Sequence, residues 1–148
     1  RSLMLGYFKN EEATKETLQD GWLHTGDNAR INEQGFYVFV DRMKDMVKRA
    51  GENIATSEIE AVLNTHPLIE DCAVVGIPDE IRDVAIKAFI IKKEGTELSS
   101  SAVISFCQQH LAKFKVPEIV EFITELPRTS VGKIQKVKLR DHSTSSNI

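Results

Sequence analysis

A basic segment near the end of the chain contains the side chain best placed to do chemistry. Between Leu126 and Arg140 the sequence reads LPRTSVGKIQKVKLR, with five Lys and Arg residues and no acid, whereas the whole 148-residue chain has a formal net charge of -3. Lys133 lies at its centre and follows Gly132, whose missing side chain lets the backbone approach a ligand. An ammonium there can lie against phosphate oxygens. An isolated lysine in such a segment is more often only a solubilising charge.

The composition is that of a globular protein, and it argues against several functions. A mildly acidic balance does not suit bulk binding to nucleic acid or to a membrane surface, which normally needs a large basic excess. No apolar run approaches the roughly 20 residues that span a bilayer, and the first residues lack a signal-peptide pattern. Cys72 and Cys107 lie far apart in apolar segments, which predicts buried thiols in a reducing compartment. We therefore expect a cytoplasmic protein whose chain binds no metal.

The first third of the chain predicts a short helix and a hairpin. Residues 11–18 (EEATKETL) are typical of a polar helix, which ends at a turn formed by Asp20 and Gly21. Strand-like runs at 28–32 and 35–40 flank a two-residue connection and predict a hairpin. The charged segment that follows is the expected domain boundary. Because the first residue is not Met and the early apolar residues have little local sequence to pack against, we expect a piece of a longer protein.

Beyond that boundary the apolar pattern predicts a small α+β domain. Ser57 and Glu60 have the spacing of a capping box at the start of a helix over 56–64. A second helix is expected after the serines at 99–101. A tight hairpin surrounds Gly51, and the expected strands are residues 46–48, 53–54, 69–77, 84–91 and 119–123. The order strand, helix, strand, strand, helix, strand is that of a split βαβ domain.

Two other functions fit this pattern poorly. RNA-recognition modules of the same topology stack bases on aromatic side chains of their central strands. Here residues 71–78 contain no aromatic residue, and residues 84–91 contain only Phe89. A phosphate loop of the form GxxxxGK[ST] is absent, because Pro127 takes the place of its first glycine and Ile134 follows the lysine. The fold by itself does not identify a function.

Three short segments, taken together, indicate a family. They are GWLHTGD at 21–27, DRMKD at 41–45 followed by GENI at 51–54, and PRTSVGKI at 127–134. Their order and approximate spacing resemble the acyl-adenylate-forming superfamily of AMP-binding enzymes, which includes acyl-CoA synthetases, luciferases and the adenylation domains of peptide synthetases. The resemblance extends from Gly6 to Arg140. GENI, together with KVP at 115–117, most resembles the CoA-ligase branch, and RDVAIKAF at 82–89 resembles the carnitine and crotonobetaine CoA ligases.

The resemblance implies a role for single residues in adenylate formation. Asp27 corresponds to the acid that accepts hydrogen bonds from the ribose hydroxyls of ATP and AMP, and Arg42 to an arginine that also reaches the ribose. Lys44 corresponds to the hinge at which the small domain rotates. Lys133, beside Gly132, corresponds to the catalytic lysine that offsets repulsion between the carboxylate and the α-phosphate. Only general electrostatic attraction is expected of the other basic residues of the segment, Arg128, Lys136, Lys138 and Arg140.

A second site is implied for the transfer of the acyl group to CoA. In the family the small domain swings after adenylate formation and presents a Gly-containing loop to the pantetheine arm. The matching loop here runs from Lys48 to Asn53, with Gly51 near its centre. Lys48 and Arg49 either contact CoA phosphates or the adenylate, or are simply basic residues of an exposed hairpin. Ala50 departs from the Gly-Gly pair of many members and adds a methyl group to the loop.

The implied reaction converts a carboxylic acid, ATP and CoA to acyl-CoA, AMP and pyrophosphate. Residues 1–43 are then the terminal piece of an N-terminal adenylation domain with the hinge entry, and residues 44–148 are the C-terminal lid domain. The rest of the N-terminal domain is the expected partner, and it would hold Mg²⁺, the phosphate loop and the acyl pocket. We therefore expect this chain alone to be inactive. Two alternatives stay open, namely an adenylation domain that loads a carrier protein and a non-catalytic binding module.

Overall fold

The chain divides into two compact units. The computed structural model describes residues 2–49, 51–79 and 83–145. The first unit is Arg1–Lys44 and the second is Asp45–Ile148, so the division lies next to the boundary expected between residues 43 and 44. That the first unit belongs to a larger adenylation domain stays a prediction. Two residues of the predicted motifs, Ala50 and Arg82, lie outside the described ranges.

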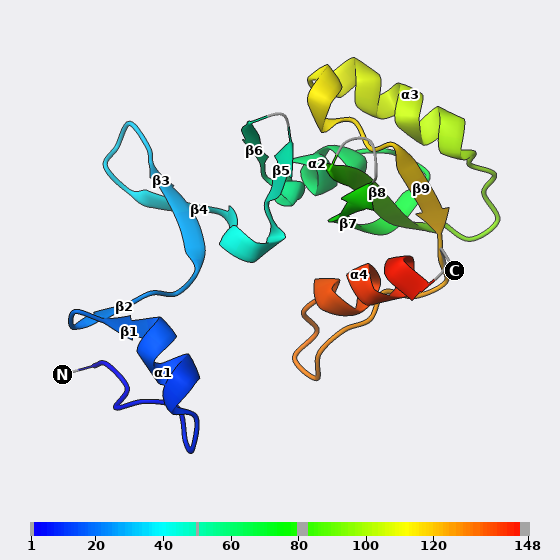
Figure 1. Ribbon diagram of the computed structural model, residues 1–148. Coiled ribbons are helices and arrows are strands. Elements are labelled where there is room, and N and C mark those ends of the chain that lie inside the picture. The colour runs from blue at the N-terminus through cyan, green and yellow to red at the C-terminus, as the bar shows by residue number, and fades with distance from the viewer. Residues whose placement is uncertain (1, 50, 80–82, 146–148) are drawn as a thin grey trace. The chain divides into compact units, whose positions relative to one another are not determined.

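The first unit contains a short helix and two small hairpins. Its elements are α1 (Glu11–Thr17), β1 (Leu18–Gln19), β2 (Trp22–Leu23), β3 (Asp27–Ile31) and β4 (Tyr37–Arg42). β3 and β4 pair antiparallel, which confirms the predicted hairpin (Figure 1). The connection between them is wider than two residues, because Asn32 Oδ1 accepts hydrogen bonds from the backbone N–H groups of Gln34 and Phe36 at 3.0 and 2.9 Å. These bonds satisfy the turn without further strand pairing.

The second unit begins with a hairpin and a helix. The 3₁₀ turn η1 (Met43–Asp45) leads into β5 (Val47–Arg49) and β6 (Glu52–Ile54), which pair around Gly51 as predicted, and α2 (Thr56–Leu63) follows. The predicted capping box is wrong. Ala55 is the N-cap residue of α2 and provides no side-chain hydrogen bond, while the carboxylate of Glu60 accepts a hydrogen bond from the backbone N–H of Val74 at 2.7 Å.

A three-stranded sheet forms the centre of the second unit. Its strands are β7 (Ile69–Asp79), β8 (Asp83–Lys92) and β9 (Ile119–Phe122), in the order β7-β8-β9. β7 and β8 are antiparallel, and β8 and β9 are parallel. The crossover between the parallel strands contains α3 (Ser100–His110) and the 3₁₀ turn η2 (Lys113–Lys115). This mixed α+β fold is the one the sequence predicts, although the β5–β6 hairpin forms its own ladder rather than a fourth strand of the sheet.

Apolar side chains cover both faces of this sheet. A first core cluster joins the hairpin, α2 and α3 to one face and includes Val47, Ile59, Val74, Ile86 and Val103. A second core cluster lies on the other face and includes Ala73, Val75, Phe89, Leu126 and Leu139. A Cβ on Gly76 would lie 2.9 Å from the side chains of Val47 and Val84, so the hairpin packs closely on β7 at that glycine.

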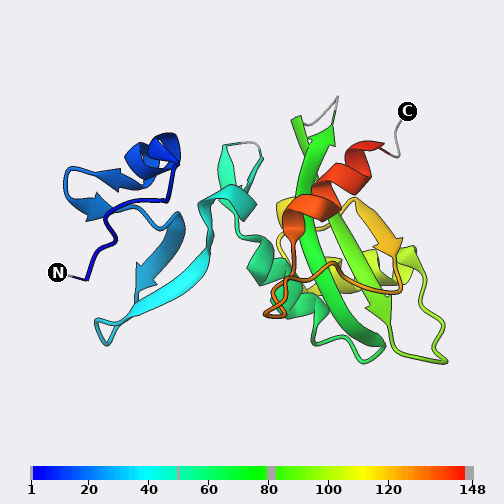
Figure 2. The same ribbon diagram turned by 90° about the horizontal axis from the view of Figure 1, so that it is seen from below.

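A last helix, α4 (Lys136–Ser145), covers the second core cluster. Figures 1 and 2 show α3 and α4 on opposite faces of the sheet. Helix α4 was not expected from the sequence, because its ten residues, KVKLRDHSTS, show almost no apolar periodicity. Leu139 is the residue of α4 in this cluster, with 5% of its surface exposed.

The burial of the two cysteines raises the pKa values of their thiols. Cys72 and Cys107 are both buried and free, as expected from their apolar neighbours. Burial raises the pKa of the Cys72 thiol to about 12, with a contribution from Glu60, and burial raises the pKa of Cys107 to about 11. Among the described residues, no helix is long and apolar enough to cross a bilayer.

Candidate functional site

Lys133 lies in a short loop that is closed by backbone hydrogen bonds. Arg128 and Ile134 form an antiparallel bridge, and the N–H of Thr129 donates to the carbonyl of Lys133 at 2.8 Å. The φ angle of Gly132 is 81°, a left-handed conformation that residues with a Cβ avoid. A Cβ there would meet no described atom of the chain within 4 Å. Conformation, and not close approach within this chain, therefore explains Gly132.

The ammonium group of Lys133 lies at the exposed tip of this loop. The backbone N–H of Lys133 donates to Thr129 Oγ1 at 3.1 Å, which holds the main chain in place. Its side chain is exposed, and within the described parts of the chain it makes no ion pair or hydrogen bond. The loop thus presents a positive charge on an ordered backbone, which is the arrangement needed to meet an anion.

Three other basic residues of the segment make ion pairs with the body of the second unit. Arg128 pairs with Asp71, Lys136 with Glu60 and Arg140 with Asp45. The expectation that these residues contribute only general electrostatics is therefore wrong. Each one ties the segment to an element that lies far away in the sequence. Among the described residues, the two other basic side chains of the segment, Lys133 and Lys138, are exposed and make no ion pair.

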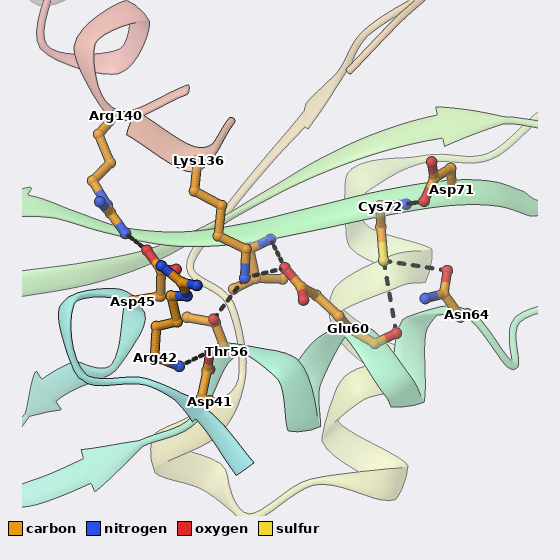
Figure 3. A network of polar contacts seen from close by, with 11 residues as sticks. Asp41, Arg42, Asp45, Thr56, Glu60, Asn64, Asp71, Cys72, Lys136 and Arg140 are labelled. Carbon is orange, nitrogen blue, oxygen red and sulfur yellow. Dashed lines mark hydrogen bonds and ion pairs between the residues drawn. The ribbon is translucent and has the colours of Figure 1, made fainter. Parts of the chain in front are cut away.

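Glu60 on α2 is the centre of the most buried polar network. Its Oε1 lies 2.7 Å from Lys136 Nζ and accepts the hydrogen bond from the backbone of Val74, and Lys136 Nζ also donates to Thr56 Oγ1 at 2.8 Å (Figure 3). The side chains of Lys136 and Glu60 are only 14% and 18% exposed. Since Thr56 begins α2 directly after the β5–β6 hairpin, this lysine connects the base of the Lys133 loop to the base of the Gly51 hairpin.

Lys44, the predicted hinge, is exposed and lies in η1 as the last residue of the first unit. Asp45 follows it as the first residue of the second unit. The carboxylate of Asp45 pairs with Arg140 on α4 (Figure 3). The residue after the predicted hinge is therefore held by the helix that follows the Lys133 loop.

In the first unit, the structure brings Asp27 and Arg42 together. They are register partners at the open end of the β3–β4 hairpin, and Arg42 Nε lies 3.2 Å from Asp27 Oδ1. Both side chains are substantially exposed, at 49% for Arg42 and 35% for Asp27. The two residues predicted to reach the same ribose thus share one site, and the acid keeps oxygen atoms available to solvent.

The residues predicted to serve CoA lie on the β5–β6 hairpin but differ in their surroundings. Lys48 is exposed, and Gly51 has a φ angle of 83° at the turn. Arg49 is half-buried. Its guanidinium pairs with Glu118, and its Nη1 donates to the carbonyl of Phe114 at 3.4 Å. Arg49 therefore has a structural partner, whereas Lys48 is exposed to solvent.

A hollow of about 360 Å³ lies beside α4 on the second face of the sheet. It is lined by apolar residues together with acids and bases, including Phe89, Glu121, Glu125, Lys138 and His142. Phe89, the one aromatic residue of residues 84–91, is buried here at 1% exposure.

Among the described residues, no group of three or more His, Cys, Asp and Glu side chains could hold a metal ion.

Three acids that form ion pairs with basic residues of these sites were not recognised from the sequence as their partners. Asp71, Glu60 and Glu118 are the partners of Arg128, Lys136 and Arg49. A signal for Asp71 exists, because it is a charged residue at the start of an apolar strand. No sequence pattern indicates which base each acid meets, since the partners are 57 and more positions apart in every case.

Comparison with known proteins identifies a family and similar chains. The family model described as the AMP-binding enzyme C-terminal domain matches residues 58–133. The crotonobetaine/carnitine–CoA ligase of Proteus mirabilis strain HI4320 is 48% identical over 141 residues, which is 95% of this chain and 27% of that relative. The ligase of the same description from Escherichia coli O139:H28 is also 48% identical with the same coverage. The chain thus spans about a quarter of the length of these curated relatives.

Solved structures show the same fold. ATP-bound MatB from Rhodopseudomonas palustris superimposes with a TM-score of 0.89 at 31% identity, over 97% of this chain and 29% of that one. The anthranilate CoA ligase AuaEII in complex with anthranoyl-AMP superimposes with a TM-score of 0.86 at 37% identity, with the same coverage. Because the family model covers half of the chain, the chain belongs to the AMP-binding enzyme C-terminal domain family.

Proposed function

We propose that this chain is the lid region of an AMP-forming acyl-CoA ligase, with the last piece of the adenylation domain in front of it. The reaction joins a carboxylic acid, ATP and CoA to give acyl-CoA, AMP and pyrophosphate. The observation that carries the proposal is Lys133, an exposed ammonium on an ordered loop that three neighbouring ion pairs tie to the domain. The similarity to CoA ligases over 95% of the chain supports it.

In the first half-reaction, a carboxylate oxygen attacks the α-phosphorus of ATP and pyrophosphate leaves. Two anions must approach each other, and Lys133 lowers this barrier by lying between the carboxylate and phosphate oxygens. A lysine suits the task because its compact charge reaches both groups without the fixed planar geometry of an arginine. Asp27 and Arg42 act on the other end of the nucleotide, where the Asp27 carboxylate accepts hydrogen bonds from the ribose hydroxyls.

In the second half-reaction, the sulfur of CoA attacks the acyl carbonyl carbon and AMP leaves. We assign this step to the β5–β6 hairpin, where Lys48 is exposed and Gly51 provides a left-handed turn. Arg49 acts here by holding the hairpin against Glu118. Rotation near Lys44 would exchange the Lys133 loop for this hairpin at the reacting centre, and the division of the chain after Lys44 supports a hinge there.

The proposal assigns the remaining parts of the site to the partner. The phosphate loop, the Mg²⁺ ligands and the acyl pocket belong to the N-terminal domain of the same polypeptide, so this chain alone should form no acyl-CoA. A carnitine-type acid is the substrate class that these curated relatives suggest. The free buried thiols Cys72 and Cys107 support a reducing compartment, and we place the enzyme in the cytoplasm.

The decisive experiment is Lys133→Ala in the full-length protein, with the two half-reactions measured separately. Carboxylate-dependent exchange of pyrophosphate into ATP should fall on the order of 10²- to 10³-fold, as for other single groups that stabilise a transition-state charge. Formation of the thioester from supplied acyl-adenylate and CoA should be largely unchanged, because Lys133 is then rotated away. Lys138→Ala, in the same segment, is the matched control and should preserve both activities.

Other results would favour the alternatives. If Lys133→Ala leaves both half-reactions unchanged, the lysine is not catalytic and the chain is better described as a binding module. If the full-length protein forms the adenylate but transfers the acyl group only to the phosphopantetheine of a carrier protein, the carrier-loading alternative is correct. The first result would contradict the catalytic role of Lys133, and the second would contradict transfer of the acyl group to CoA.

A further inference from the structure

Asp71 lies on the face of the sheet that carries α4 because of an irregularity in β7. Residues two apart in a regular strand share a face, yet Ile69 belongs to the first core cluster while Ala73 and Val75 belong to the second. The register of β7 against β8 shifts between Ile69 and Asp71, and such a bulge redirects the side chains that follow. Asp71 therefore points to the face of the second cluster, where the loop 128–134 lies.

The two terminal nitrogen atoms of the Arg128 guanidinium bind different partners. Its Nη2 pairs with Asp71 Oδ2, and its Nη1 donates to the carbonyl of Gly132 at 2.7 Å. The other carboxylate oxygen of Asp71 accepts a hydrogen bond from the backbone N–H of Cys72 at 2.8 Å. Cys72 is buried in the first core cluster. An unbroken series of contacts thus runs from the rigid sheet, through Asp71 and Arg128, to the residue directly before Lys133.

We propose that the Asp71–Arg128 pair is a positioning device that sets the direction of Lys133 for adenylate formation. This inference rests on the proposed function of Lys133. The fork of the guanidinium holds the carbonyl of Gly132 and so fixes the peptide that joins Gly132 to Lys133. Arg128 does not touch substrate in this account, and its effect reaches the reaction only through the orientation of the Lys133 backbone.

The Asp71–Arg128 ion pair is too exposed to contribute much to the stability of the protein. The side chains of Arg128 and Asp71 are 44% and 29% exposed, and ion pairs at such positions add little to the stability of a protein. None of the loop side chains between Thr129 and Lys133 is buried. Gly132 is therefore held by the backbone hydrogen bonds of the turn and by the hydrogen bond from Arg128. Loss of Arg128 should disorder the loop and leave the sheet intact.

The first test uses the chain itself and needs no activity. In the unchanged chain, we expect the backbone amides of Gly132 and Lys133 to have NMR order parameters of about 0.85, the value of a rigid backbone. In the variants Arg128→Gln and Asp71→Asn, these order parameters should fall toward about 0.6. The melting temperature should stay close to that of the unchanged chain. Lys138→Gln removes one charge from the same segment and should alter neither quantity. Unchanged order parameters in both variants would overturn the inference whatever the function of the protein.

The second test uses the full-length enzyme. Arg128→Gln should reduce pyrophosphate exchange on the order of 10- to 100-fold through misplacement of the lysine, with thioester formation from supplied acyl-adenylate unchanged. Arg128→Lys keeps the charge but cannot hold both partners, so it should restore only part of the rate. The exchanged pair Asp71→Arg with Arg128→Asp keeps both charges but should not restore exchange, because a carboxylate at position 128 cannot donate to the carbonyl of Gly132.

The outcomes separate this inference from the proposed function. If Lys133→Ala abolishes exchange and Arg128→Gln does not reduce it, the positioning role is wrong and the catalytic lysine stands. If Arg128→Gln lowers both half-reactions equally together with the melting temperature, the pair is structural and the inference is overturned. If Lys133→Ala has no effect, the proposed function fails first, and the order parameters alone then decide whether the pair orients the loop.

Discussion

Lysines of the same segment differ in what their ammonium groups contact. Lys136 lies against Glu60 and Thr56 and is largely buried, whereas Lys133, three positions earlier, is exposed. Burial of a lysine requires an anionic partner because desolvation disfavours the charge. A lysine that meets a substrate anion must instead keep its ammonium accessible until that anion arrives. The environment of Lys136 therefore indicates a structural role, and the exposure of Lys133 is compatible with the catalytic role that we propose for it.

At the same scale, the exposed pair of Asp27 and Arg42 leads to a prediction about ATP. In the full-length enzyme, Asp27→Asn should raise the KM for ATP on the order of 10- to 100-fold, because a hydrogen bond to a charged group contributes about 1.5–3 kcal/mol. The change also weakens the contact with Arg42, 3.2 Å away. The KM of the carboxylic acid should change little. Initial rates at varied ATP measure the effect.

A matched control exists in the same unit. Asp20 lies at a tight turn with a φ angle of 51°, a conformation that asparagine tolerates as well as aspartate does. Asp20→Asn therefore removes one exposed carboxylate and leaves the ribose contacts in place. Equal rises in KM for both variants would mean that the effect is one of overall charge, and would contradict the assignment of Asp27.

At the scale of elements, α4 depends on a few contacts. It is a polar helix that packs through Leu139 and is held by Lys136 in its first turn and by Arg140. Isolated helices of this length are marginal in water, so tertiary contacts must stabilise it. Because α4 directly follows the loop that carries Lys133, the ion pairs that hold the helix also fix where that loop leaves the sheet.

We therefore expect Lys136→Met to destabilise the second unit. The substitution keeps the aliphatic volume but leaves Glu60 with one fewer partner in a site where both side chains are less than 20% exposed. Breaking a fully buried pair costs about 3–5 kcal/mol, and partial exposure together with the remaining Val74 hydrogen bond reduces our expectation to about 1–3 kcal/mol. Urea unfolding followed by circular dichroism measures this free energy.

Lys138→Met provides the comparison for this prediction. Lys138 lies two positions further along the same helix and is exposed. Its substitution should change the free energy of unfolding by no more than about 0.5 kcal/mol, as is usual for surface positions. A similar loss in both variants would mean that methionine disturbs the helix itself, and that the pair with Glu60 is not the cause.

At the scale of the whole molecule, the second unit is organised by a sheet that is covered on both faces. The first core cluster contains both thiols, Cys72 and Cys107. Cys72 Sγ lies 3.7 Å from the carbonyl of Glu60 and 3.5 Å from Asn64 Oδ1. Both groups favour the protonated thiol, as burial does. Glu60, which pairs with Lys136 through its side chain, thus also contacts the Cys72 thiol through its backbone carbonyl.

This environment predicts how stability depends on pH. Burial raises the pKa of Cys72 from its ordinary value of 9.0 to about 12, and that of Cys107 to about 11. The unfolded chain loses these protons near pH 9 while the folded chain keeps them, so their stabilising effect is complete below pH 9 and is lost as the pH rises toward 11 and 12. Each thiol should contribute a slope of up to about 1.4 kcal/mol per pH unit.

The double variant Cys72→Ala with Cys107→Ala isolates this contribution. It is less stable at neutral pH, because it leaves cavities in the core, but its free energy of unfolding should fall less steeply than that of the unchanged chain between pH 9 and 11. Urea midpoints over this range give the comparison. Parallel curves would mean that the thiols ionise alike in the folded and unfolded chains, contrary to the raised pKa values.

Much of the fold followed from local patterns, whereas the candidate site residues followed from the resemblance to a family. Nearly continuous apolar runs predicted β7 and β8, and Ser99 before an apolar face predicted α3, whose first turn it caps at 3.2 Å from the N–H of Ala102. The turn residues around Gly51 predicted the second hairpin. These features depend on backbone preference and on burial of nearby side chains, which a sequence records directly. Helix α4 and the N-cap of α2 escaped prediction because distant contacts decide them.

The sequence by itself determined which residue types are present and in which motifs they occur, and so pointed to Lys133, Asp27 and the loop around Gly51. Only the tertiary structure decided that Arg128 and Lys136 are structural anchors and that Asp71 and Glu60 hold them. The physical reason is that an ion pair has no sequence periodicity. It forms wherever folding of the apolar core brings opposite charges together, and here the bulge in β7 and the placement of α2 beside it decide which acid meets which base.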